Sequence, residues 1–266
     1  MIAAIAMTVA IAVTGVHLVV SSFGTGQPSA FVPTAPQTSL TPESLEPSPS
    51  ASEAPSPTPS KPKPKPSPSR KPVTIPGPPP PAPAPSPVPS GVVCPYHYGT
   101  DAPLADVGTA LETAAARHFW TTSPVNLPVP LIKAIAKQES GWQSTIVACD
   151  GGIGTMQIMP NTATWMNQRF GTSYDLKTLS GNTMIGSAYL QWLIKYFGDV
   201  YFDSSYSLGT DDCAQDPNVP DYKEPCLLNA VIAAYNYGYG KVDTPNGLVI
   251  PNPDYVRPVR ALMLQY

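Results

Sequence analysis

The distribution of proline is the feature that most constrains how this chain can fold. Of the 36 prolines in 266 residues, 23 lie between residues 28 and 91, mixed with Ser, Ala and Thr. This stretch has few aromatic or large aliphatic side chains, so it cannot bury enough apolar surface to offset the entropy of ordering. We therefore predict that residues 24–91 form a disordered linker and that residues 92–266 form one domain of ordinary size.

The N-terminal segment is the most hydrophobic part of the chain. Residues 1–20 contain no Lys, Arg, Asp or Glu, and the run is long enough to span a bilayer as a helix. Residues 1–23 are therefore either a cleaved signal peptide or a membrane anchor. A basic start and a clean cleavage site are both missing, and we favour the anchor. In either case the domain is expected outside the membrane.

The charge of the chain argues against one class of partner. Residues 92–266 carry ten basic and fifteen acidic groups, which makes the domain −5. Binding of nucleic acid needs clustered Lys and Arg, so we expect no nucleic-acid partner. The basic part of the linker, KPKPKPSPSRKP at 61–72, favours an extended chain. An extended linker of about 64 residues reaches about 200 Å, which suits a domain held away from a membrane.

Four cysteines suggest two disulfides in an exported domain. Three pairings are possible. We favour Cys213–Cys226, which closes a polar loop, and Cys94–Cys149, which ties the start of the domain to the loop after residue 139. Zinc is the alternative, but no CxxC motif occurs and the three histidines are scattered. We therefore predict no metal site.

The domain is predicted to be mainly α-helical. Apolar residues recur at three and four positions in several segments, whereas strand-like alternation is scarce. The segments with helical spacing are 103–119, 131–139, 182–197 and 227–235. Two further segments are rich in Asp, Pro, Gly and Tyr and are predicted as long loops, 200–224 and 238–254.

Glu139, in the stretch IAKQESGW, is a carboxylate on an apolar helical face. Ile132, Ile135 and Ala136 precede it by seven, four and three residues, the spacing of one face. Burial and the negative C-terminal end of the helix both disfavour the charged form of Glu139, which predicts a raised pKa. A carboxyl group protonated near neutral pH suits a general acid. The alternative is a structural Glu paired with Lys or Arg, and this helix taken alone favours that alternative.

Two further stretches supply candidate walls of a cleft. GGIGTMQIMPNT, residues 151–162, is a glycine-rich loop that ends at Pro160, a favourable first residue of a helix. The loop can wrap a ligand closely, and Gln157 offers a donor and an acceptor to a sugar. AAYNYGYG, residues 233–240, places Tyr235 on an apolar face. The hydroxyl of this tyrosine needs a buried partner, and a carboxyl group would serve.

These stretches resemble the three motifs of the soluble-type (SLT) lytic transglycosylases, which share a goose-lysozyme-like fold. The motifs stand in the family order as ESGW at 139–142, GTMQIMP at 154–160 and AYNYG at 234–238. The resemblance covers roughly residues 125–240. It implies a lysozyme-like domain in the bacterial cell envelope, without a cofactor. The chain departs from the family at Thr155, where a hydrophobic residue is usual.

The resemblance also implies roles for the matched residues. Glu139 would act as the single catalytic acid and base, and Tyr235 would orient its carboxyl group. The product would be a 1,6-anhydro end formed at the bond between N-acetylmuramic acid and N-acetylglucosamine. The other positions that shape the site would be Ser140, Met156, Gln157 and Asn236. The rings that can stack on sugars, and for which core packing is an equally good explanation, are Trp142, Trp165 and Tyr237.

The expected partner is a peptidoglycan glycan strand bound by a monomer, with the membrane as a second partner if residues 1–20 are retained. Ordinary glycosidases use two carboxylates. An internal 6-hydroxyl nucleophile removes the need for the second one. If Asp150 or Asp175 reached across the cleft and positioned a water molecule, the enzyme would instead be a hydrolytic muramidase. A third reading is a peptidoglycan-binding module without activity, which the retention of Glu139 disfavours.

Overall fold

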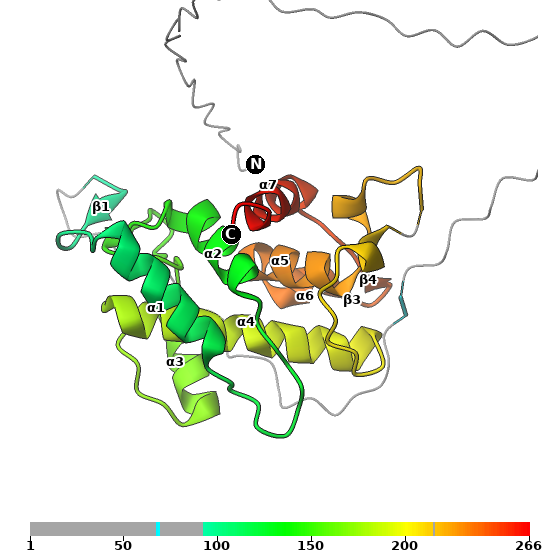
Figure 1. The fold of residues 1–266 in the computed structure, drawn as a ribbon, viewed down its shortest axis with the longest axis horizontal. Coiled ribbons are helices and arrows are strands. Elements are labelled where there is room, and N and C mark those ends of the chain that lie inside the picture. Colours follow the sequence, from blue (N-terminus) through cyan, green and yellow to red (C-terminus); the bar gives the residue numbers. More distant parts are fainter. Residues whose placement is uncertain (1–67, 70–92, 215) are drawn as a thin grey trace, which may run out of the picture. The chain divides into compact units, whose positions relative to one another are not determined.

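The computed structural model describes residues 68–69, 93–214 and 216–266 (Figure 1). The helices and strands, in chain order, are β1 (Tyr96–His97), α1 (Leu104–Ala116), α2 (Val129–Ser140), β2 (Ile146–Val147), α3 (Pro160–Phe170), α4 (Leu179–Tyr201), η1 (Asp211–Cys213), η2 (Asp221–Lys223), α5 (Leu227–Tyr237), α6 (Tyr239–Val242), β3 (Asp243–Thr244), β4 (Gly247–Leu248) and α7 (Pro253–Met263). The predictions for residues 1–23, and for 24–91 apart from 68–69, lie outside the described residues. Within the described ranges no helix is both long and apolar enough to cross a bilayer.

The described part of the chain is mainly helical, as predicted. The predicted helices correspond to α1, α2, α4 and α5, and α3 begins at Pro160. One prediction needs correction, and one helix was not predicted. The segments predicted as long loops contain the short helices η1, η2 and α6 and the paired strands β3 and β4. The C-terminal helix α7 was not predicted, because Pro258 lies inside it and proline disfavours a helix interior.

The helix α2 begins and ends as its sequence dictates. Pro130 stands in its first turn, where the missing N–H costs nothing, and Gly141 ends it in the left-handed conformation with a φ of 66°. Leu131, Ile132 and Ile135 on its inner face are fully buried. Burial of each such side chain contributes about 1.5–3 kcal/mol. The helix packs against α1 and α7 (Figure 1), so its C-terminal turn is held between other elements.

The long helix α4 is the centre of the core. It packs against α1, α3 and α5, and large side chains such as Trp192, Phe197 and Leu193 are almost or fully buried along it. Thr178 caps its start by accepting a hydrogen bond from the Gly181 amide at 3.0 Å. The helix therefore provides a rigid base for the loop that precedes α3.

Both predicted disulfides are present. Cys94–Cys149 lies beside the antiparallel pair of β1 and β2 and joins the start of the domain to the loop after α2. Cys213–Cys226 joins η1 to the residue that precedes α5. In each pair the Cα atoms are 5.1 Å apart. The described residues contain no free cysteine.

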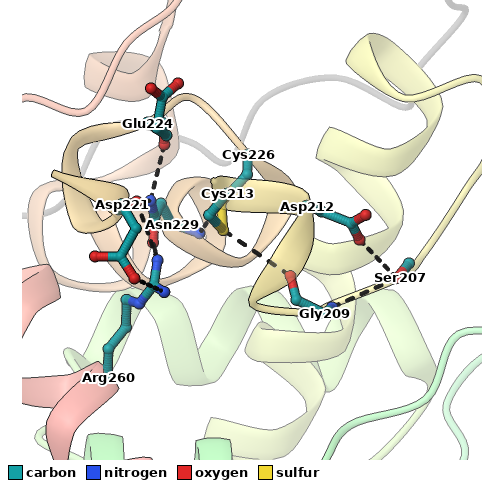
Figure 2. Close-up of a disulfide and its surroundings, with 9 residues drawn as sticks. All are labelled: Ser207, Gly209, Asp212, Cys213, Asp221, Glu224, Cys226, Asn229 and Arg260. Carbon is teal, nitrogen blue, oxygen red and sulfur yellow. Dashed lines mark hydrogen bonds and ion pairs between the residues drawn. A yellow bond between two sulfur atoms is a disulfide. The ribbon is translucent and has the colours of Figure 1, made fainter. Parts of the chain in front are cut away.

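A polar network near the second disulfide joins α7 to the start of α5 (Figure 2). The Asn229 amide donates to the carbonyl oxygens of Asp221 and Glu224, at 2.7 and 2.8 Å. Arg260 donates to the Asn229 side chain and to the Asp221 carbonyl, both at 3.0 Å, and forms an ion pair with the Asp221 carboxylate. Because Arg260 belongs to α7, the network helps to fix the position of that helix.

Candidate active site

The glycine-rich loop between β2 and α3 is held by three side chains from three helices. From α2, the Ser140 hydroxyl donates to the Thr155 carbonyl at 2.7 Å. From α4, Asn182 accepts from the Met156 amide at 2.8 Å. From α5, the Tyr235 hydroxyl donates to the Met156 carbonyl at 2.8 Å. The loop that contains the second motif is therefore joined to the first and third motifs by hydrogen bonds.

Two glycines make this close packing possible. Gly154 has a φ of +70°, and a Cβ there would lie 2.8 Å from the Asn182 side-chain nitrogen. A Cβ on Gly186 of α4 would lie 2.8 Å from the Met156 side chain, which is fully buried. Gln157 has a φ of 48°, and its side-chain amide donates to the Gly154 carbonyl at 2.9 Å. The Met156 side chain therefore serves to seat the loop on α4.

The Glu139 carboxyl group lies in the last turn of α2 and is largely removed from solvent. Burial raises the pKa of Glu139 to about 7, the Tyr255 hydrogen bond lowers it, and the charge of Asp150 raises it. Among the described residues no Lys, Arg or His forms an ion pair with it, and Lys133 instead pairs with Glu112 at 2.6 Å. Within the described ranges, the structural alternative for Glu139, pairing with a cation, is therefore not observed.

The hydrogen-bond partner of this carboxyl group is Tyr255, a residue that the sequence analysis missed. Its hydroxyl donates to Glu139 Oε1 from α7, 116 residues further along the chain. We expected Tyr235 to make this bond, but its hydroxyl donates to Met156. Burial and the charge of Glu139 raise the pKa of Tyr235 well above the ordinary value, so the two groups influence each other electrostatically. No local pattern around Tyr255 marks it, since its role depends on α7 packing against α2.

The two candidates for a second carboxylate differ in position. Asp150 is close enough for its charge to raise the pKa of Glu139. It is exposed, and it accepts a hydrogen bond from the Gly152 amide at 3.1 Å. Asp175 accepts from the Lys177 amide at 2.9 Å, and the pKa of Tyr98 is raised by burial first and then by the charge of Asp175. Asp150 is therefore the carboxylate that shares the electrostatic environment of Glu139.

The remaining predicted residues have varied environments. Trp142 stacks on Tyr266, with ring centroids 5.3 Å apart. Trp165 is 9 % exposed and packs edge-on against Trp192 at 4.6 Å. Tyr237 is 55 % exposed. These contacts account for Trp142 and Trp165 as packing residues, while the Tyr237 ring remains accessible. Another motif residue, Asn236, is exposed and accepts from the Asn252 amide at 2.9 Å.

The sequence that forms this site matches a known domain family. Residues 121–249 match the model of the transglycosylase SLT domain. These residues are an SLT domain. The match includes Glu139, the glycine-rich loop and Tyr235, and it ends before α7. Tyr255 therefore reaches the Glu139 carboxyl group from outside the matched residues.

Similar proteins align with part of this chain. The soluble lytic murein transglycosylase of Escherichia coli K12 is 35 % identical over 98 residues, which are 33 % of this chain and 15 % of that protein. The Salmonella typhimurium protein of the same name is 36 % identical over 83 residues, which are 29 % of this chain and 13 % of its own length. The alignments thus span a small part of these relatives.

The solved structures that are similar to part of this chain include two lytic transglycosylases. One is an inactive variant of the lytic transglycosylase Slt from Pseudomonas aeruginosa, with 21 % identity and a TM-score of 0.40 over 62 % of this chain and 24 % of that one. The other is the 70 kDa soluble lytic transglycosylase of Escherichia coli, with 26 % identity and a TM-score of 0.40 over 60 % of this chain and 24 % of that one.

Proposed function

We propose that this protein is a peptidoglycan lytic transglycosylase in which Glu139 is the single catalytic acid and base. The observation that carries the proposal is the Glu139 carboxyl group itself. It has a pKa of about 7, it has no cationic partner among the described residues, and it lies within an SLT domain. Such a group can hold a proton and release it near neutral pH.

In the first step, the Glu139 carboxylic acid gives its proton to the glycosidic oxygen between N-acetylmuramic acid and N-acetylglucosamine. The bond between that oxygen and the anomeric carbon of muramic acid breaks, and N-acetylglucosamine leaves with a hydroxyl group. The Tyr255 hydroxyl donates to Glu139, so it stabilises the carboxylate that forms as the proton leaves.

In the second step, the Glu139 carboxylate accepts the proton of the muramic acid 6-hydroxyl group. The 6-oxygen attacks the anomeric carbon of the same sugar, which closes the 1,6-anhydro ring. Glu139 regains its proton and no water is consumed. Hydrogen bonds donated by Ser140 and Tyr235 and one accepted by Asn182 hold the glycine-rich loop as one wall of the proposed binding cleft. Gln157, Asn236 and Tyr237 remain proposed contacts for the sugar.

A hydrolytic muramidase is the second candidate, and Asp150 is the observation that favours it. Its charge acts on Glu139, and it is exposed on the loop after β2. A carboxylate at this position could hold a water molecule for attack on the anomeric carbon. In that case the product would carry a reducing end instead of an anhydro ring. A peptidoglycan-binding module without activity would release no product.

The products distinguish the three candidates. The full chain is incubated with purified peptidoglycan, and the soluble fragments are analysed by mass spectrometry. We expect anhydro ends, which lack the water that hydrolysis adds, and we expect Glu139→Gln to abolish release because an amide cannot transfer the proton. Reducing ends would identify a muramidase. Absence of fragments from a folded chain, or an active Glu139→Gln variant, would contradict the proposal for Glu139.

We further propose that the domain works as a monomer in the bacterial cell envelope, carried by the linker at 24–91 and by a signal or anchor at 1–23. The apolar run of residues 1–20 and the proline content of the linker support this location. Fractionation of cells that produce the full chain tests it. Recovery with the membrane fraction supports an anchor, recovery outside the cell supports a cleaved signal, and recovery in the cytoplasm would contradict both.

A further inference from the structure

A concave site lies between the segment after α1 and the end of α3. This cavity is broadly open to solvent and has a volume of about 500 Å³. It is lined by Phe119, Trp120, Trp165, Gln168, Arg169 and Phe170. Four of these six residues are aromatic and one is cationic. The site uses none of the residues assigned to catalysis, although Trp165 was predicted as a ring that stacks on sugars.

The walls of the cavity are held in place by buried groups. Gln191 of α4 is 1 % exposed, accepts from the Phe119 amide at 3.0 Å and donates to the Arg117 carbonyl at 2.5 Å. The Trp120 ring meets the edge of Phe170, with centroids 5.5 Å apart. The cavity is therefore formed before any ligand arrives, as is usual for binding sites of small molecules.

The guanidinium of Arg169 lies at this cavity without a counter-charge from the described residues. It lies 5.3 Å from the centroid of the Trp120 ring and 6.0 Å from that of Phe170. Among the described residues no carboxylate forms an ion pair with it, and its Nε atom is buried without a hydrogen-bond partner. The nearby Lys195, whose ammonium also lies over Trp120, is paired with Asp199. A partly buried cation without a counter-charge is costly unless an anion supplies it.

Trp120 presents a second unfilled donor. Its Nε1 atom is buried and has no hydrogen-bond partner within the described part of the chain. Buried polar atoms in folded proteins are normally paired, so two unfilled donors at one aromatic cavity indicate an acceptor that comes from a ligand. A carboxylate accepts from both a guanidinium and an indole N–H, and the aromatic rings suit the apolar face of a sugar or an aliphatic group beside it.

We propose that this cavity binds a carboxylate carried next to a sugar ring or a short aliphatic segment, with Arg169 as the counter-charge and Trp120 as the second donor. Peptidoglycan presents this chemistry in two places, the lactyl carboxylate of muramic acid and the carboxylates of the stem peptide, and this choice of source rests on the proposed function. The cavity then anchors a part of the polymer that is not being cleaved. Ring contacts from Trp165 through Tyr189 to Tyr235, at 6.1 and 5.5 Å, connect it to the candidate active site.

Binding of three small probes to the full chain tests the proposal and separates the two sources. N-acetylmuramic acid carries a sugar and a carboxylate, the dipeptide L-alanyl-γ-D-glutamate carries carboxylates without a sugar, and N-acetylglucosamine carries a sugar alone. Binding is followed by tryptophan fluorescence and by the indole N–H signals in nuclear magnetic resonance spectra, with Trp120→Phe used to assign the Trp120 signal. We expect at least one carboxylate probe to bind and to shift that signal, and N-acetylglucosamine to bind at least tenfold more weakly.

Matched variants identify the residues responsible. Arg169→Gln should weaken binding of the carboxylate probe at least tenfold. Trp120→Phe keeps an aromatic ring but removes the indole N–H donor, and it should also weaken binding. Arg257→Gln removes an exposed arginine from α7 and should leave binding unchanged. Thermal unfolding of each variant confirms that it is folded. Equal binding by Arg169→Gln and the unchanged chain, equal binding of N-acetylglucosamine, or no binding of either carboxylate probe would overturn the proposal.

The binding test is independent of the proposed reaction. Carboxylate binding that depends on Arg169, in a chain that releases no anhydro ends from peptidoglycan, would support the cavity and contradict the transglycosylase. Anhydro ends from a chain in which Arg169→Gln changes no binding would support the transglycosylase and contradict the cavity.

Discussion

Glu139 must donate a proton and then accept one, and its surroundings balance these two demands. Burial favours the neutral form, while the hydrogen bond from Tyr255 favours the charged form. The result is a pKa of about 7, at which both forms are well populated near neutral pH. A carboxyl group at the ordinary value would rarely hold a proton there, and one without the tyrosine would release it less readily.

The raised pKa predicts that Glu139 makes folding less favourable at high pH. Its pKa is about 7 in the folded state, against an ordinary value of 4.5. Between these values the folded state holds a proton that the unfolded state has released, so the free energy of unfolding falls as pH rises. Glu139→Gln cannot ionise. It should be more stable than the unchanged chain by on the order of 2–3 kcal/mol at about pH 8, and similar to it at about pH 4.

Denaturant unfolding at these two pH values measures the effect. The variant and the unchanged chain should have similar stability at the lower pH, and the variant should be the more stable of the two at the higher pH. A difference of the same size at both would show that the pKa of Glu139 is not raised by folding.

Tyr255 is predicted to act as a positioning residue for Glu139. Tyr255→Phe removes the hydrogen bond that lowers the pKa of Glu139, so the loss of activity at alkaline pH should move to higher pH. The carboxyl group also loses its orientation, and we expect kcat to fall by about ten- to a hundredfold. The pH profile of kcat/KM measures the first effect.

Tyr222→Phe is the matched control, since it removes a hydroxyl from η2 and should change neither quantity. A Tyr255→Phe profile that falls at the same pH as that of the unchanged chain would contradict the role of the hydrogen bond.

At the scale of elements, the glycine-rich loop is positioned by helices that precede and follow it in the chain. Ser140, Asn182 and Tyr235 reach it from α2, α4 and α5. The loop residues Thr155 and Met156 are both fully buried, so the loop is part of the core and not a surface connection. One detail is unfavourable. The Thr155 hydroxyl is buried and has no hydrogen-bond partner among the residues that the structure describes.

Replacing this hydroxyl is predicted to stabilise the domain. Thr155→Val keeps the shape of the side chain and removes the unpaired oxygen, so we expect a gain of about 1 kcal/mol. This corresponds to a rise of about 2–4 °C in Tm for a domain of this size. The matched control is Thr145→Val, whose hydroxyl donates to the Gly99 carbonyl at 2.9 Å. The control should lose about 1 kcal/mol, and equal changes in Tm for both variants would refute the explanation.

At the scale of the domain, two covalent links join segments that are distant in the sequence. Cys94–Cys149 spans 55 residues and holds the first strand against the loop that follows Glu139. Cys213–Cys226 spans 13 residues near the network of Asp221, Asn229 and Arg260 (Figure 2). Both limit the freedom of the unfolded chain, and the longer loop has more freedom to lose.

Removal of each disulfide is therefore predicted to destabilise the domain to a different degree. Replacing Cys94 and Cys149 by Ser should cost about 4 kcal/mol, and replacing Cys213 and Cys226 by Ser should cost about 3 kcal/mol. Chemical denaturation without reductant measures both variants. Adding a reductant to the unchanged chain should lower its Tm, and a Tm that does not respond would contradict a stabilising role for either bond.

The amino-acid sequence by itself determined the features that depend on neighbours along the chain. Apolar spacing located α1, α2, α4 and α5, Pro160 marked the start of α3, and the projection of α2 placed Glu139 on a buried face with a raised pKa. The reason is that helical periodicity and burial on one face are local properties of a segment. The favoured cysteine pairing also agrees with the structure. For Cys213–Cys226 the reason was local, because this pair closes a short polar loop.

Only the tertiary structure decided which groups meet Glu139. Tyr255, 116 residues further along the chain, reaches Glu139 because α7 packs against α2. The helix α7 was not predicted from the sequence, because Pro258 lies inside it. Tyr235, expected at the carboxyl group, instead holds the glycine-rich loop. Arg169 and Trp120 likewise come together only because α3 and the segment after α1 share one cavity. Contacts of this kind depend on how helices pack, which no periodicity within a single segment encodes.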